Sequence, residues 1–308
     1  HYPEPALRIF GDLDLLVPRD GLGLAEAALN GLGYFCTKPR EWALDHHFHL
    51  PPMASEDATL TVDLHWRLDD PERAGCLPTA DLWARSETWW IQGRRTARLN
   101  DVDQVLHVCR HAMVQHLGRL GLLPVCDLAL LTRSWVVAEW RALVQRAEEY
   151  GLQRAVGFAL LLVQRALGME LPEGLLAELG SPRGDPESSD LTKWFLALDA
   201  GPGAPVSAQA VRAWRQGSLP KRVSYLLRHM FPGRKGMSAL YGVPIDSPQI
   251  WLTYLRRPVD LFQRYGGSAA DALRGDPGAR AAWGREAWLE RWLSEEVGER
   301  ELETSTTG

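Results

Sequence analysis

The stretch RIFGDLDLLV at residues 8–17, together with TLTVDLHW at residues 59–66, carries the pattern that decides the fold of this chain. Each stretch is short, rich in Leu, Val and Thr and bounded by turn residues, which is typical of a β-strand. Residues i and i+2 of a strand point to the same face, so Asp12 and Asp14 project together. With the second stretch beside the first, Asp63 completes a cluster of three carboxylates on neighbouring strands.

Such a cluster favours a divalent metal ion. Carboxylates this close repel one another unless a cation lies between them, and hard ions such as Mg²⁺ or Mn²⁺ bind through a few carboxylates plus substrate phosphates. We expect Asp12 and Asp14 to hold two ions, with Asp63 as a ligand of the second and as a base for an attacking hydroxyl. Sites of this kind catalyse phosphoryl or nucleotidyl transfer. The alternative is a solvated strand edge that binds nothing.

Three residues near the acids are candidate phosphate or nucleotide contacts. Arg8 lies four residues before Asp12 and on the same face by period, where it would contact a phosphate or offset the acidic charge. His65 and Arg67 share the face of Asp63 in a regular strand, within reach of a nucleotide or an acceptor. Arg67 pairing with the carboxylates is an equally good interpretation.

A histidine-rich stretch at residues 45–50 is expected to form a strand that pairs with residues 60–68. Asp45, His47 and His49 would then alternate on one face. One interpretation is a strand that binds the acceptor or lies next to the metal ions. The other, which we favour, is a half-exposed strand that happens to be rich in histidine.

The interval between Asp199 and Asp246 contains no acidic residue, although the chain as a whole has a net charge of -5. Its basic residues are Arg212, Arg215, Lys221, Arg222, Arg228, Arg234 and Lys235. This charge segregation favours contact with a triphosphate or with a polyanionic acceptor such as RNA. We expect Arg234 and Lys235 to make that contact, from a turn at residues 231–236 whose glycines allow close approach. The alternative is a solvated helix face paired with acids elsewhere.

Composition narrows the class of protein. A chain of 308 residues suggests roughly two domains, and 45% hydrophobic with 24% charged residues is typical of a globular protein. No apolar run approaches the roughly 20 residues of a membrane span, and no signal peptide is evident. The four cysteines lie far apart, which predicts free thiols in a reducing compartment and hence a cytoplasmic protein.

The order of predicted elements gives an α+β fold, in which a small mixed-sheet core at residues 1–100 precedes a larger all-helical region at residues 101–300. The core is expected to contain a strand at 7–17, a helix at 22–32 ended by Gly33, a strand at 34–37 and the strand pair above. Residues 301–308 are expected to form a disordered tail. Helical periodicity predicts helices at residues 101–117, 124–134, 136–150, 152–168, 172–179, 191–198, 208–216, 221–229, 250–265 and 281–293.

The acidic pattern resembles the nucleotidyltransferase superfamily that includes DNA polymerase beta, whose hallmark is an Asp-x-Asp strand followed by a third acid on a later strand. The closer resemblance is to the bacterial group labelled uncharacterised nucleotidyltransferase. It is carried by residues 8–17, 62–66 and 107–131, with a weaker similarity at 226–242 and 251–258. The resemblance implies transfer of a nucleoside monophosphate from a nucleoside triphosphate to a hydroxyl acceptor, with Mg²⁺ or Mn²⁺ bound by the three acids.

This chain departs from the superfamily before its first strand. The superfamily places a Gly-Ser or Lys-Gly turn there, which approaches the triphosphate, and none of the eleven residues before Asp12 forms one. Either the turn lies upstream, or the protein is a non-catalytic nucleotide-binding or scaffold protein that retains the fold. A phosphotransferase using the same metal site is a further alternative. The acceptor of a nucleotidyltransferase would be a small molecule, a tRNA end or a peptide.

Overall fold

In a computed structural model, the described part of the chain comprises residues 2–4, 7–8, 10–56, 60–68, 76–118, 120–181, 218–274 and 288–293. The chain divides into two compact units, each assembled from segments that are distant in the sequence. Unit 1 comprises His1–Leu7, Pro71–Gly201 and Arg285–Gly308, and unit 2 comprises Arg8–Asp70 and Pro202–Gly284. The expected division at residue 100 would give two domains that are each continuous in the sequence, and it stays a prediction. The expected disordered tail at residues 301–308 also stays a prediction, because it lies outside the described residues.

Unit 2 contains a four-stranded mixed sheet in the order β1-β4-β3-β2. Its strands are β1 (Asp12–Leu16), β2 (Phe35–Cys36), β3 (Met53–Ala54) and β4 (Thr61–His65). β1 runs parallel to β4, whereas β3 is antiparallel to both β4 and β2. The expected first strand is shorter than 7–17, because regular pairing with β4 covers only Asp12 to Leu16.

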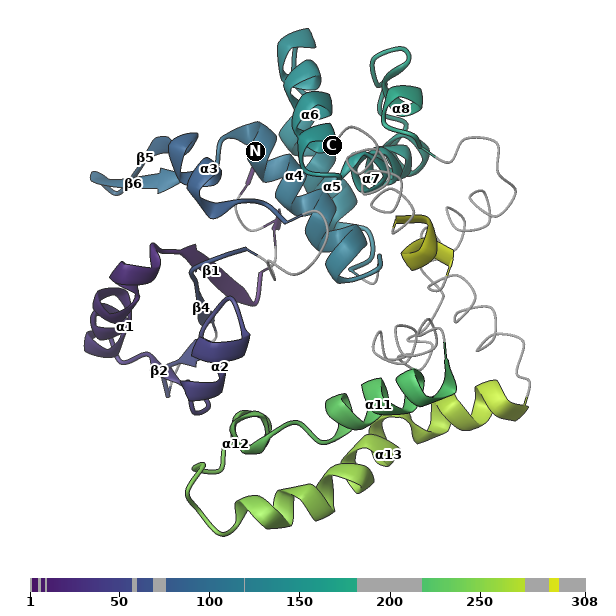
Figure 1. The fold of residues 1–308 in the computed structure, drawn as a ribbon. Coiled ribbons are helices and arrows are strands. Elements are labelled where there is room, and N and C mark those ends of the chain that lie inside the picture. The colour runs from purple at the N-terminus through teal and green to yellow at the C-terminus, as the bar shows by residue number, and fades with distance from the viewer. Residues whose placement is uncertain are drawn as a thin grey trace, which may run out of the picture. The chain divides into compact units, whose positions relative to one another are not determined.

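Where the sheet is formed by β4, one face is buried and the other is more exposed. Along β4, Val62 and Leu64 are buried and alternate with half-buried polar residues, as a strand with one solvated face should. The apolar cluster consists of Leu22, Leu50, Met53, Leu64 and Trp66. Helix α1 (Leu22–Gly31) supplies Leu22 and packs on this face (Figure 1), which confirms the predicted helix and its end before Gly33, at φ 87°.

The predicted strand at residues 45–50 is wrong. Residues Glu41–His46 form helix α2, with Glu41 in its first turn and Leu44 against the apolar cluster. Only His49 pairs with β4, through an isolated antiparallel bridge to His65. Asp45 therefore does not alternate on a strand face with the histidines, because a helix has a period of 3.6 residues.

The remainder of unit 2 is helical where it is described. It contains α11 (Leu219–Met230), α12 (Arg234–Tyr241) and α13 (Ile250–Arg274), and α12 packs against α2. The helices predicted at 221–229 and 250–265 are confirmed, whereas those at 191–198 and 208–216 lie outside the described residues. The predicted turn at 231–236 is too long, because Gly233 caps α12 and the helix begins at Arg234.

Unit 1 is built mainly from helices packed around one buried helix. Its elements are α3 (Thr79–Ala84), strands β5 (Glu87–Ile91) and β6 (Arg94–Arg98), α4 (Asp101–Arg110), a π-helical turn η3 (His111–Gln115), α5 (Leu123–Thr132), α6 (Val137–Glu149), α7 (Gln153–Leu167) and α8 (Leu175–Glu178). The run from Ala155 to Val163 in α7 is buried, and α7 packs against α4, α5, α6 and α8. The α+β class is therefore confirmed. The β5–β6 hairpin, which turns at Gln92 and Gly93, was not predicted.

No helix in the described part of the chain is long and apolar enough to cross a lipid bilayer.

Candidate functional site

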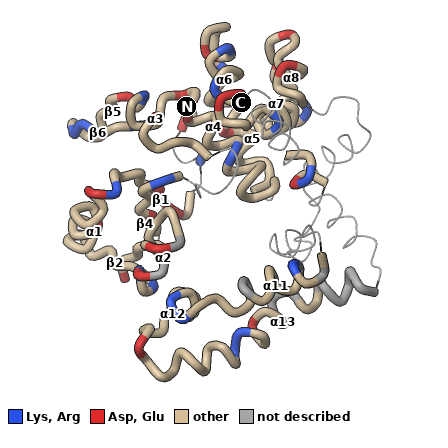
Figure 2. The backbone as a smooth tube through the Cα atoms, viewed as in Figure 1, with Lys and Arg blue, Asp and Glu red and all other residues tan. Residues whose placement is uncertain are grey.

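The three carboxylates predicted to cluster do so, on the open face of the unit 2 sheet. In the parallel register of β1 and β4, Asp14 lies opposite Asp63 and Asp12 lies opposite Thr61. Asp12, Asp14 and Asp63 each offer one carboxylate oxygen, and these oxygens lie within 4.8 Å of one another. Figure 2 shows the described backbone with all Asp and Glu residues coloured red. The cluster follows from strand periodicity and register together.

Asp63 is the least solvated member of the cluster. Its Oδ1 is buried and has no hydrogen-bond partner in the described part of the chain. Desolvation, and then the negative charges of Asp14 and Asp12, raise the pKa of Asp63, while His65 opposes the rise. Asp14 is 56% exposed by comparison. A buried carboxylate oxygen without a donor, beside two other carboxylates, is the environment that a bound cation stabilises, so these residues fit a divalent metal ion.

His65 lies on the face of Asp63, as predicted. Its Nε2 is 3.0 Å from Asp14 Oδ1 and its Nδ1 is 3.3 Å from the backbone oxygen of Arg67. The His65 side chain is only 13% exposed. Arg67 itself is exposed, and Arg8 is half-buried at the start of unit 2. Contact of Arg8 and Arg67 with phosphate stays a prediction.

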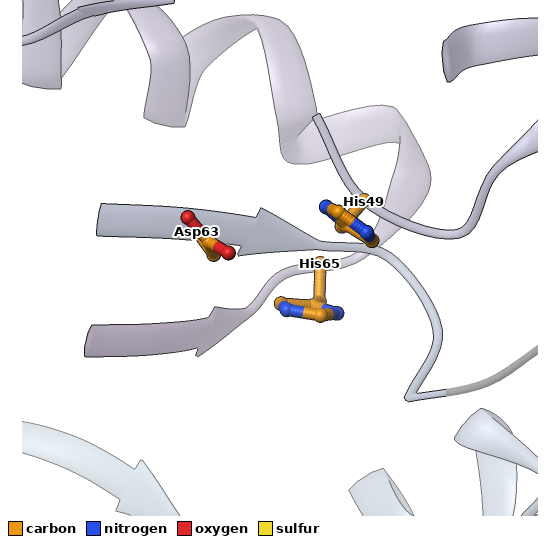
Figure 3. Close-up of side chains that lie close together, drawn as sticks. All are labelled: His49, Asp63 and His65. Carbon is orange, nitrogen blue, oxygen red and sulfur yellow. The ribbon is translucent and has the colours of Figure 1, made fainter. Parts of the chain in front are cut away.

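His49 joins this group through the backbone. The isolated bridge sets His49 opposite His65, so both side chains project on the face of Asp63. The two imidazole centroids are 4.8 Å apart, and Figure 3 shows His49, Asp63 and His65 gathered at the end of β4. Burial, and then the charge of His65, lower the pKa of His49. The sequence predicted His49 on a strand at residues 45–50, with a position next to the metal ions as one interpretation. The strand is wrong, but His49 does lie beside Asp63.

The two basic candidates in α12 already have partners. Lys235 forms an ion pair with Asp45 that links α12 to α2. Arg234 donates a 2.7 Å hydrogen bond to the carbonyl oxygen of Ile245, and its guanidinium lies 5.6 Å from the ring centroid of Trp251. The pairing of Lys235 supports the alternative in which basic residues of this interval pair with acids elsewhere. Arg212 and Arg215 lie outside the described residues.

Comparison with known proteins identifies the family. The family described as "uncharacterised nucleotidyltransferase" matches residues 1–168, which is more than half of the 308 residues and includes all three acids. The chain therefore belongs to this family, which indicates a transferase that uses a nucleoside triphosphate and a divalent metal. No curated protein and no solved structure matches the chain.

Proposed function

We propose that this member of the uncharacterised nucleotidyltransferase family moves a nucleoside monophosphate from a nucleoside triphosphate to a hydroxyl acceptor, at the acidic cluster of unit 2. The observation that supports the proposal is the placement of three carboxylate oxygens, from two paired parallel strands, within 4.8 Å of one another. The buried Oδ1 of Asp63 adds to it, because that oxygen has no hydrogen-bond partner within the described chain.

In this proposal Asp12, Asp14 and Asp63 hold Mg²⁺ or Mn²⁺. When bound, such ions neutralise phosphate charge and lower the pKa of a coordinated hydroxyl. The acceptor oxygen attacks the α-phosphorus in line, a new P–O bond forms, and the bond to pyrophosphate breaks. Asp63 accepts the hydroxyl proton, a role open to a carboxylate that lies beside the reacting groups.

The other residues orient the reactants. The backbone oxygen of Arg67 accepts a hydrogen bond from His65 Nδ1 and so fixes the His65 ring, whose Nε2 lies 3.0 Å from Asp14 Oδ1. The side chains of Arg8 and Arg67 are proposed to bind the triphosphate. A phosphate contact by Lys235 requires that its ion pair with Asp45 opens, so Lys235 contributes less to binding than the other two.

The first test is thermal unfolding with ATP, GTP, CTP or UTP, each with and without Mg²⁺ or Mn²⁺. A ligand that binds only the folded state raises the unfolding temperature with its concentration. We expect a metal-dependent rise for the wild type and for Asp20→Asn, a control that removes an exposed carboxylate outside the cluster. Asp14→Asn should lose the rise. If no nucleotide shifts the wild type, the scaffold alternative replaces the proposal.

Product analysis then separates the two transfer reactions. Label in the α-phosphate of the nucleotide should pass to the acceptor, with release of pyrophosphate. Transfer of γ-phosphate label, with release of a nucleoside diphosphate, would establish the phosphotransferase alternative. Small molecules, tRNA and peptides are tested as acceptors in parallel, and a steep loss of acceptor binding with added salt would point to RNA.

A further inference from the structure

Beside the acidic cluster lies a second group of potential ligands that differs from it in chemistry. His49, Asp63 and His65 each offer one nitrogen or oxygen atom, and these atoms lie within 4.8 Å of one another. All three residues are half-buried, and Figure 3 shows them converging from β4 and from the segment that bridges to it. Two imidazoles and one carboxylate make a nitrogen-rich donor set, whereas the acidic cluster offers oxygen alone.

The backbone fixes which nitrogen of each histidine is available. His49 Nδ1 lies 2.7 Å from the carbonyl oxygen of Leu50, and His65 Nδ1 lies 3.3 Å from that of Arg67. A carbonyl oxygen only accepts hydrogen bonds, so both Nδ1 atoms carry a proton and donate it. In a neutral ring this leaves the lone pair on Nε2. Histidines that bind metals are held in the same way, with the other ring nitrogen donating to a backbone carbonyl or a carboxylate.

A cation would be stabilised beside these lone pairs. His65 Nε2 is 3.0 Å from Asp14 Oδ1, and two acceptors at that distance repel each other unless a positive charge lies with them. A proton on His65 would satisfy that contact alone. A metal ion would also engage His49 and the Asp63 carboxylate, whose buried Oδ1 has no hydrogen-bond partner in the described part of the chain.

We propose that His49 Nε2, His65 Nε2 and the Asp63 carboxylate bind one transition-metal ion of the Zn²⁺ class, next to the acidic cluster. Imidazole nitrogen suits Zn²⁺, Co²⁺ and Ni²⁺, whereas Mg²⁺ prefers oxygen ligands alone. Asp63 has two carboxylate oxygens and serves both groups. Three protein ligands leave a coordination position open, as in catalytic rather than structural zinc sites. The site goes beyond the proposed function and does not depend on it.

The test measures binding of the metal alone to the metal-free chain of 308 residues. Zn²⁺ is quantified by equilibrium dialysis and elemental analysis, and Co²⁺ by its visible absorption. His49→Ala removes one ligand, and His49→Gln removes it while keeping a polar side chain of similar size. The matched control is His47→Ala, because His47 is exposed and its ring centroid is 5.3 Å from that of His49, yet it is outside the donor set.

We expect the wild type, His47→Ala and Asp12→Asn to bind one Zn²⁺ with similar affinity. Substitution of residues that only support the metal ligands costs about 10–100-fold in metal affinity. Loss of the ligand His49 itself should therefore lower the affinity for Zn²⁺ at least about tenfold in both His49→Ala and His49→Gln. The Co²⁺ absorption should disappear with it. Equal Zn²⁺ affinity in the wild type and the His49 variants, or an equal loss in His47→Ala, would overturn the proposal.

Nucleotide binding separates this proposal from the previous one. The Mg²⁺-dependent thermal shift with nucleotide should persist in His49→Ala, because His49 is not part of the acidic cluster. Loss of Zn²⁺ binding with retention of that shift supports two adjacent sites. Loss of both in His49→Ala would contradict a separate transition-metal site.

Discussion

Asp103 in unit 1 and Asp63 in unit 2 are both at least partly buried, but their surroundings differ. Hydrogen-bond donors surround Asp103, whereas other carboxylates lie beside Asp63. Asp103 is fully buried and receives hydrogen bonds from Arg85 at 2.9 and 3.2 Å and from Arg146 at 3.0 Å. Asn100 also donates to it, at 2.6 Å. Asp63 instead lies beside two further carboxylates, and one of its oxygens has no partner in the described chain.

Asp103 is therefore a structural acid, whereas Asp63 is the acid that we propose binds a ligand. A buried charge is tolerated when its lone pairs are satisfied and an opposite charge neutralises it, which describes Asp103. The hydrogen-bond network continues through unit 1, because Arg85 donates to Tyr150, which donates to Asp81. Asp63 has no such set of partners in the described chain. Burial and neighbouring carboxylates raise its pKa, and pKa values raised in this way are typical of functional sites. Four substitutions test whether the contrast holds.

The largest effect should come from Asp14→Asn. Metal ions contribute several kcal/mol to stabilisation of the transition state, so the rate of nucleotidyl transfer should fall by at least about a thousandfold. Circular dichroism and urea unfolding should be unchanged, because Asp14 is 56% exposed. Asp20→Asn serves as the control with full activity. An active Asp14→Asn enzyme would refute the assignment of the acidic cluster as the catalytic site.

Asp103→Ala should be the most destabilising substitution. It leaves Arg85 and Arg146 facing each other without their shared carboxylate, and removal of one partner of a buried ion pair costs about 3–5 kcal/mol. Urea unfolding measures the loss. Arg98→Ala is a useful comparison, since Arg98 pairs with the more exposed Asp101 and Glu87 and should cost about 1 kcal/mol or less. Similar losses for both variants would remove the distinction between the two kinds of acid.

Asp63→Asn should have the opposite sign in the absence of metal. Because the pKa of Asp63 is raised on folding, the native state binds more protons, and stability falls as pH rises through the folded pKa. The amide removes that cost, so metal-free Asp63→Asn should gain up to about 1 kcal/mol at neutral pH and less near pH 4. Urea unfolding at the two pH values measures it. A stability loss at neutral pH would mean that Asp63 is already neutralised by the chain.

Lys235→Ala should have the smallest effect on stability. Both members of its ion pair with Asp45 are 48% exposed, and exposed pairs contribute about 0.2–1 kcal/mol. The unfolding free energy in urea should therefore change by less than about 1 kcal/mol. The nucleotide-dependent thermal shift tests whether Lys235 also binds phosphate. A reduced shift would show that the ion pair opens to bind phosphate, and an unchanged shift would leave Lys235 a structural residue.

Elements with strong local signals could be predicted from the sequence. Asn100 caps α4 by accepting a hydrogen bond from the backbone nitrogen of Asp103, and helix α1 ends before Gly33. The helices between residues 101 and 168 follow their apolar periodicity, although η3 interrupts the first of them. Short elements were less predictable. Residues 45–50 alternate like a strand, yet α2 extends to His46, with Leu44 packed against the apolar cluster of unit 2.

The sequence by itself determined that Asp12 and Asp14 share a face, because side chains alternate with a period of two along any strand. Which residues meet that face was decided by tertiary structure. Burial of Val62 and Leu64 fixes the orientation of β4, and its register with β1 sets Asp63 opposite Asp14. A slip of one residue would turn Asp63 into the core. The approach of His49, and the choice of Asp103 rather than Asp101 as the buried acid, depend on long-range packing that no local pattern encodes.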